Sequence, residues 1–203
     1  MTNILFFDTE TTGLPNFKSP SADPSQPSVL QLGAILCTTS GEELECWETL
    51  IKIGDKPIHP MALAAHNISA DKANSGGIDK TEAFNTFYEL SRKAESLCCH
   101  NFNFDIRLIK IMAAQCGEDT GEVENYDLCL SEILDLPYFC TMLSTIKYCA
   151  LPFPSGRKGN KFPKLSELYQ ILFDEEFIGA HDALTDVRGT VRCFFELRKR
   201  GIL

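Results

Sequence analysis

Two carboxylates separated by a single residue lie near the start of the chain. Asp8 and Glu10 follow the apolar residues 4–7, which are typical of a strand. Side chains two residues apart on a strand project to the same face, so these carboxylates share one small volume and repel each other. No lysine or arginine precedes Lys18, and a divalent cation with oxygen ligands would relieve the repulsion. The alternative is that Asp8 ends the strand and Glu10 is solvated.

Two later segments carry carboxylates at positions that could complete such a site. Asp105 follows a short apolar stretch and begins an amphipathic segment. Asp186 belongs to a segment with apolar residues at helical spacing, and Asp182 suits its N-cap. On one helix, His181 and Asp186 would point apart, because five residues correspond to roughly 500° of rotation. They converge only if His181 lies on the preceding loop, which predicts a mobile histidine base beside a fixed carboxylate.

Taken together, these segments resemble the three motifs of the DEDDh group of 3′-to-5′ exonucleases, the DnaQ-like family within the ribonuclease H-like superfamily. Residues 8–13 match the first motif, residues 100–105 match the second, and His181 with Asp186 match the third. Three motifs in the correct order are far more specific than any one of them. The resemblance implies an α/β fold, a ribonuclease H-like layered domain with a central mixed β-sheet flanked by helices. We expect one exonuclease domain over residues 1–203.

The resemblance also implies a mechanism and a set of site residues. A metal-dependent 3′-to-5′ exonuclease would release nucleoside 5′-monophosphates from nucleic-acid 3′ ends, with single-stranded DNA favoured. His181 would be the general base, and two Mg²⁺ or Mn²⁺ ions would promote in-line displacement at phosphorus. The acids that would hold the ions are Asp8, which would bridge both, Glu10, Asp105 and Asp186. The residues that would contact substrate are Thr9, Thr11, Gly13, Leu14, His66, Asn101 and Phe104.

Two of the motif histidines have competing interpretations. His66 resembles a substrate-contacting histidine of the family, but a lone histidine at the end of a helix is often a capping or core residue. His100 belongs to the second motif, and the resemblance implies that it supports the structure. We therefore expect His100 to be structural and His66 to contact substrate.

Hydrophobic periodicity and turn residues predict an alternation of strands and helices. This alternation favours a layered α/β domain with a mixed sheet. The predicted strands are 3–8, 29–37, 44–53, 97–100 and 138–140. One predicted helix begins near Met61. The others extend over 81–95, 103–115, 142–149, 164–173 and 183–200. Asp79 and Glu82 form a possible capping box at the start of helix 81–95.

Two loops have unusual composition. Residues 15–28 contain four prolines and four serines directly after the first motif, and we expect this segment to be mobile. Residues 154–164 contain four positive charges and no acid. This second loop is either a solvated turn or a segment that contacts phosphates.

The overall composition limits the class of protein. The net charge of −9 disfavours a packaging or storage protein for nucleic acid, whereas an enzyme that trims strand ends needs few phosphate contacts at a time. Nine cysteines without a Cys-x-x-Cys spacing fit reduced thiols better than a disulfide framework or a zinc site. No signal-type or membrane-spanning segment is apparent, so we expect a cytoplasmic protein with no membrane association.

Two other functions stay open. A phosphatase with an aspartate nucleophile also begins with an apolar strand, but it needs a second aspartate where this chain has Glu10. A proofreading or polymerase-docking module without activity would lack one of the metal acids, and all of them are present. The sequence does not distinguish DNA from RNA as substrate, and a DNA polymerase is a possible partner.

Overall fold

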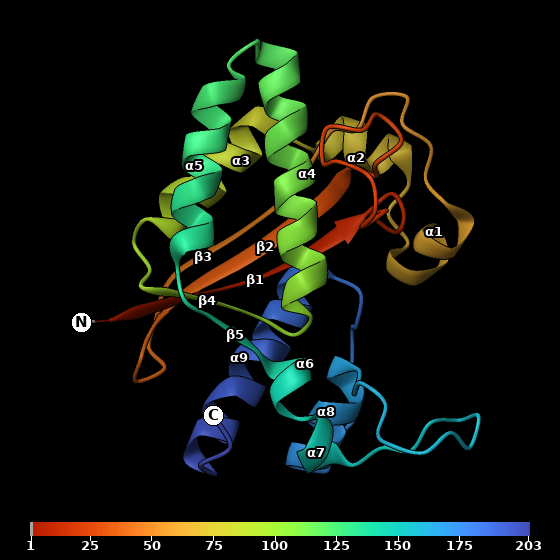
Figure 1. Cartoon of the computed structure of the whole chain (residues 1–203), viewed down its shortest axis with the longest axis vertical. Helices are drawn as coiled ribbons and strands as arrows, with labels where there is room; N and C mark the ends of the chain where they lie inside the picture. The colour runs from red at the N-terminus through yellow and green to blue at the C-terminus, as the bar shows by residue number, and fades with distance from the viewer. Residues whose placement is uncertain (1) are drawn as a thin grey trace.

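A five-stranded mixed sheet forms the centre of the computed structural model, which describes residues 2–203 (Figure 1). The strand order is β3-β2-β1-β4-β5. The first three strands are antiparallel, and the last two run parallel to β1. The strands are β1 (Asn3–Thr11), β2 (Val29–Thr38), β3 (Glu43–Leu50), β4 (Ser96–Cys99) and β5 (Tyr138–Cys140).

Helices cover both faces of the sheet. In Figure 1, α3, α4 and α5 lie above it, and α9 lies below it together with α6, α7 and α8. The helices are α1 (Pro60–His66), α2 (Ala70–Gly76), α3 (Lys80–Ser91), α4 (Phe102–Thr120), α5 (Val123–Asp135), α6 (Thr141–Ser144), α7 (Ile146–Cys149), α8 (Leu165–Phe173) and α9 (Ala183–Lys199). None of the helices in this described part of the chain is long and apolar enough to cross a membrane.

Alternation along β1 assigns its side chains to the two layers. Leu5 and Phe7 belong to the core beneath α3 and α4, and the ring of Phe7 lies 5.0 Å from that of Phe87. Ile4 and Phe6 belong to the core that α9 covers. The same alternation continues past the apolar residues, so β1 delivers its polar side chains to both layers.

All five predicted strands are present, but β1 runs past the expected end at 8 and β3 ends at Leu50 instead of 53. Several helices differ more, and α3 ends at Ser91 instead of 95. Because β1 continues to Thr11, Asp8 does not end the strand, and the alternative that it does is wrong. The expected helix 142–149 is two short helices that meet at Thr145. The sequence predicted neither α2 nor α5, and α4 extends five residues beyond the expected end at 115. Asp79 caps α3 as predicted, and its carboxylate accepts from the N–H of Thr81 at 2.8 Å. The predicted capping box with Glu82 does not form, because it requires a bond to the N–H of Glu82 instead.

The proline- and serine-rich loop 15–28 is held by hydrogen bonds, contrary to the expectation of mobility. Gln26 is fully buried, and its amide accepts from Asn16 N at 3.0 Å and donates to Asn16 O at 2.9 Å. Arg107 of α4 donates to the carbonyl oxygens of Ser19 and Asn16 at 2.5 and 3.1 Å. These bonds satisfy backbone groups that have no sheet partner, so the loop has a defined conformation.

Candidate active site

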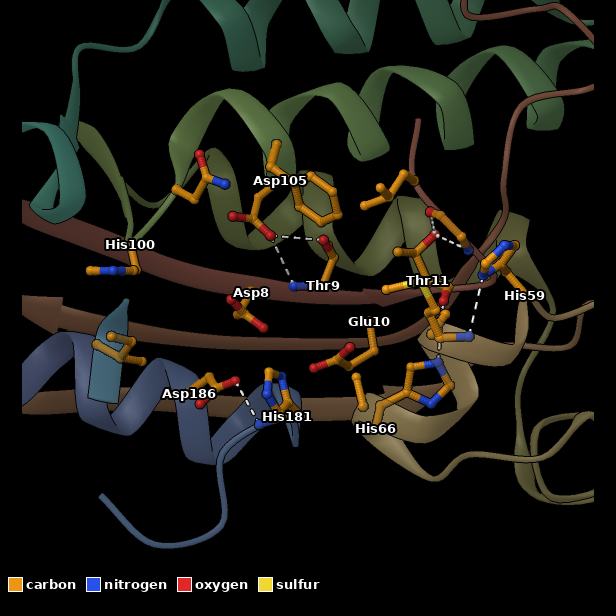
Figure 2. A pocket seen from close by; sticks show the side chains of 18 residues that line it. Asp8, Thr9, Glu10, Thr11, His59, His66, His100, Asp105, His181 and Asp186 are labelled. Atoms are coloured by element: carbon orange, nitrogen blue, oxygen red, sulfur yellow. Dashed lines mark hydrogen bonds between the residues drawn. The ribbon is translucent and has the colours of Figure 1, made fainter. Parts of the chain in front are cut away.

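The pleat of β1 places the two carboxylates of the first motif on the face of the sheet that α9 covers. Asp8 and Glu10 continue the series of Ile4 and Phe6, while Thr9 points toward α4 (Figure 2). Acids from two further elements, Asp105 and Asp186, approach the same region. The site thus lies where the end of β1 meets the first turns of α4 and α9.

Asp105 is fixed by the residue between the two strand acids. Thr9 donates to Asp105 Oδ1 from its backbone N at 3.1 Å and from its hydroxyl at 2.8 Å. Both groups are buried. Because both bonds end on one carboxylate oxygen, Oδ2 is left for another ligand. Thr9 therefore orients Asp105, a role that the sequence analysis did not assign to it.

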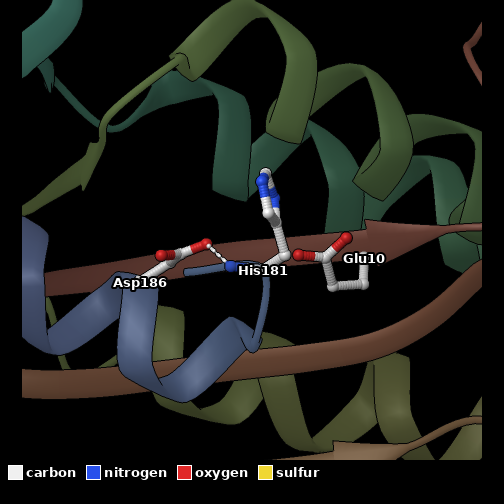
Figure 3. Close-up of side chains that lie close together, drawn as sticks. All are labelled: Glu10, His181 and Asp186. Atoms are coloured by element: carbon white, nitrogen blue, oxygen red, sulfur yellow. Dashed lines mark hydrogen bonds between the residues drawn. The ribbon is translucent and has the colours of Figure 1, made fainter. Parts of the chain in front are cut away.

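The N-terminus of α9 brings in the third motif. Asp182 caps the helix and accepts from Thr185 N at 3.0 Å and from the Thr185 hydroxyl at 2.7 Å. His181 lies on the loop, as predicted, and its backbone has a φ of 70°. Its N–H donates to Asp186 Oδ2 at 3.0 Å (Figure 3). One donor atom each from Glu10, His181 and Asp186 lie within 4.8 Å of one another.

The electrostatics of the pocket favour a bound cation. Burial, together with the charges of Asp105 and Asp186, raises the pKa of Asp8 well above its ordinary value. Burial and neighbouring carboxylates raise the pKa of Glu10 to about 8. Burial also raises the pKa values of Asp105 and Asp186 to about 7 and about 6. Four mutually repelling carboxylates offer the oxygen ligands that divalent metal ions such as Mg²⁺ prefer, so these residues fit the metal that the sequence predicted.

A cavity of about 610 Å³ contains the whole predicted site. Every residue predicted to act in catalysis, metal binding or substrate binding lines it (Figure 2). Six further residues line it: His100, which was expected to support the structure, and five that no motif indicated, His59, Met61, Ala62, Ala65 and Leu165. Four of these flank or belong to α1, and their only signal in the sequence was their proximity to His66. They make one wall of the cavity largely apolar.

His66 has both ring nitrogens engaged with the backbone. Nδ1 accepts from Ile68 N at 2.9 Å, and Nε2 faces the carbonyl oxygen of Thr11 at 3.2 Å. Since Nδ1 accepts, the proton lies on Nε2 and is donated to Thr11. Burial lowers the pKa of the ring. His66 thus ties α1 to the end of β1 and offers the cavity no free ring nitrogen.

The second motif begins with a histidine that supports the structure. His100 Nδ1 lies 2.9 Å from the Thr141 hydroxyl, and Nε2 lies 2.9 Å from the carbonyl oxygen of Pro163. Burial lowers its pKa to about 4, which keeps the ring neutral. Asn101 begins α4 without a capping bond from its side chain. Its amide is therefore available to a ligand in the cavity.

Comparison with known proteins gives consistent matches. The exonuclease family model RNase_T matches residues 5–194. The crystal structure of E. coli exonuclease I in complex with a dA16 oligonucleotide matches with a TM-score of 0.73 and 19% identity, over 98% of this chain and 41% of that chain. The zinc-bound form of the E. coli exonuclease I complex with single-stranded DNA matches with a TM-score of 0.70, at 19% identity and the same coverage.

An exonuclease I from Methylocaldum szegediense matches with a TM-score of 0.65 and 20% identity, over 98% of this chain and 41% of that chain. No curated protein sequence matches the chain. The chain therefore spans about 41% of the length of these solved structures. The likeness confirms the predicted fold class.

Proposed function

The chain belongs to the RNase_T exonuclease family, and from this we propose that it is a DEDDh-type, metal-dependent 3′-to-5′ exonuclease that removes nucleotides from single-stranded DNA. The observation that carries the proposal is the convergence of four carboxylates and a loop histidine in one cavity. An inactive docking module would have no need to gather four mutually repelling acids in one cavity. The single-stranded substrate is supported by the oligonucleotides bound to the similar exonuclease I structures.

The acids Asp8, Glu10, Asp105 and Asp186 would hold two Mg²⁺ or Mn²⁺ ions. When bound, such ions supply a hydroxide nucleophile near neutral pH and stabilise the developing negative charge of the displacement. A divalent requirement agrees with the zinc-bound form of exonuclease I. Thr9 contributes by holding Asp105 at a fixed angle through two hydrogen bonds.

His181 would accept the proton of the attacking water. Its ring is exposed and lies on a loop, while its backbone N–H is bound to Asp186. This bond ties the loop to α9, so the motion that proton transfer needs would come from the side chain. The competing role is that of a metal ligand, since a ring nitrogen lies within 4.8 Å of donor atoms of Glu10 and Asp186.

The apolar wall of the cavity would hold the terminal nucleotide. Leu14 and Met61 are 86% and 78% exposed at its mouth, and such side chains can cover a base or sugar. Phe104 would stack on the nucleotide. Thr11 and Gly13 shape the turn beneath it, because the Thr11 hydroxyl donates to Gly13 O at 3.0 Å. Asn101 would offer its amide to a phosphate or sugar oxygen.

We further propose two Mg²⁺ or Mn²⁺ ions, DNA rather than RNA as the substrate, a single domain over residues 1–203, a cytoplasmic location and a DNA polymerase as partner. Proofreading would be the role of the enzyme if such a partner exists.

The direct test is degradation of matched single-stranded DNA and RNA, labelled at either end, with Mg²⁺ or Mn²⁺. We expect a 3′ label to appear at once as a mononucleotide and a 5′ label to move down a ladder one nucleotide at a time. EDTA should stop both. Early release of the 5′ label as a mononucleotide, 3′-labelled products longer than one nucleotide, or activity in EDTA would contradict the proposal.

A further inference from the structure

The residues of β2 that face the two strand acids are also the residues on which α9 docks. In the register of β1 with β2, Glu10 pairs with Gln31 and Asp8 pairs with Gly33. Both β2 residues contact the start of α9. We call Gln31 and Gly33 the docking pair.

Gln31 makes hydrogen bonds from both ends of its amide. Nε2 donates to Glu48 Oε1 at 2.6 Å and to Asp182 Oδ2 at 3.1 Å, while Oε1 accepts from Ala183 N at 3.2 Å. Carboxylates near neutral pH only accept and a backbone N–H only donates, so the amide can adopt one orientation. The side chain is 6% exposed. It therefore links the helix cap to β2 and β3 at a single position.

Gly33 allows α9 to approach the sheet closely. A Cβ at this position would lie 2.8 Å from Leu184 N and 2.9 Å from the carbonyl carbon of Ala183. Both are backbone atoms and cannot move aside as a side chain would. Any larger residue would therefore displace the first turn of the helix.

We infer that Gln31 is a positioning residue that sets His181 and Asp186 relative to Glu10. Asp182, which Gln31 holds, directly follows His181 and lies one helical turn before Asp186. The triad with donor atoms within 4.8 Å joins this helix start to β1. The docking pair thus fixes the distance of His181 and Asp186, at the start of α9, from Glu10 on β1. The expected effect on catalysis rests on the proposed function, whereas the positioning of His181 and Asp186 by Gln31 does not depend on it.

The test compares Gln31→Met with Glu43→Gln. Methionine has similar length and no hydrogen-bonding amide. Glu43 also ties α9 to β3, through Arg188 at 3.0 Å, but it does not line the cavity. Its variant therefore controls for general loosening of the helix.

Hydrogen exchange of the metal-free proteins gives the first readout. We expect the amides of residues 181–186 to exchange faster in Gln31→Met than in wild type, and to be unchanged in Glu43→Gln. Calorimetry should show Mn²⁺ affinity reduced by about 10- to 100-fold in Gln31→Met alone, the scale found for residues that orient metal ligands. On oligonucleotide, kcat at saturating Mn²⁺ should fall while KM is kept.

Each outcome decides the inference. Unchanged exchange and Mn²⁺ affinity in Gln31→Met would overturn it, as would equal losses in both variants. Gln31→Ala is the second route if Gln31→Met does not fold, since it also removes the amide, and it should show the same faster exchange at residues 181–186. A wild-type protein without nuclease activity would refute the proposed function, while exchange and Mn²⁺ binding would still test the positioning role.

Discussion

Each acid of the site is placed by a different local rule. The strand period turns Asp8 and Glu10 to one side, two hydrogen bonds from Thr9 hold Asp105, and the N–H of His181 holds one oxygen of Asp186. No described cation forms a salt bridge with any of them. Protons or a bound metal must therefore offset their repulsion, and this requirement links the chemistry of the site to its stability.

Replacing the central acid separates activity from folding. We expect Asp8→Ala to abolish nucleotide release, by ~10³-fold or more, since the metal interactions that it removes contribute several kcal/mol to the transition state. Metal-free stability should stay level or rise, because a repelling carboxylate is removed. Gel assays with Mn²⁺ and thermal unfolding in EDTA measure the two effects. Asp55→Ala, at an exposed loop position, is the control, and near wild-type activity in Asp8→Ala would refute the two-metal assignment.

The histidine of the third motif is expected to move protons rather than bind metal. His181→Ala should lower turnover by ~10²–10⁴-fold, the usual effect of losing a general base. Its structural bond to Asp186 uses the backbone N–H, which alanine keeps. Mn²⁺ affinity by calorimetry and oligonucleotide binding should then change little. If the variant instead loses most of its Mn²⁺ affinity, His181 is a ligand.

At the scale of elements, periodicity predicted those that build the site. The acids lie on β1, α4 and α9, whose apolar residues follow clear strand or helix spacing. The missed elements lack that signal. In α5 only Tyr126 and Ile133 are buried, so its apolar stripe is narrow, and α2 has only seven residues. The apolar wall on α1 was missed because Met61, Ala62 and Ala65 face a cavity that exists only after the chain has folded.

The basic loop 154–164 provides a prediction at the same scale. Lys161 forms an ion pair with Glu167 at 2.5 Å, so the tip cations Arg157 and Lys158 are better placed to contact phosphates. The loop returns beside the cavity, where His100 contacts Pro163. We expect Arg157→Ala with Lys158→Ala to weaken binding equally for all single-stranded sequences.

Salt dependence distinguishes a phosphate contact from a solvated turn. Each lost contact should reduce the log–log slope of affinity against salt by about 0.7 for a single strand. The measurement is fluorescence anisotropy in EDTA over a range of salt concentrations. Lys199→Ala is a matched control, because this lysine is 81% exposed near the end of α9. An unchanged slope would mean that the loop is a solvated turn.

At the scale of the molecule, the sheet separates two main hydrophobic cores, and side chains of β1 enter both. The larger core lies beneath α3, α4 and α5, and a smaller one lies beneath α9. The sequence predicted the layered α/β class from the order of the elements. It could not predict how closely α9 approaches β2, because that distance depends on Gly33 and on hydrogen bonds between residues about 150 positions apart.

The buried acids should make the stability of the metal-free protein depend on pH. The pKa of Glu10 is raised from an ordinary value of 4.5 to about 8. Between these values the unfolded state has released a proton that the folded state still holds. The stability contributed by protonated Glu10 is therefore fully present below pH 4.5 and is lost as the pH rises toward 8, at up to about 1.4 kcal/mol per pH unit for one group.

Glu10→Gln isolates this contribution, because glutamine cannot ionise. In EDTA, we expect the variant to gain stability relative to wild type as the pH rises from 5 to 8, measured by urea unfolding at each pH. With saturating Mn²⁺ the wild type should become the more stable of the two proteins. The ion binds the folded wild type and offsets the repulsion, whereas the variant has lost a ligand. A difference between the proteins that is the same at every pH in EDTA would contradict the raised pKa. A difference that varies with pH but is unaffected by Mn²⁺ would show that Glu10 is buried and titrates without binding metal.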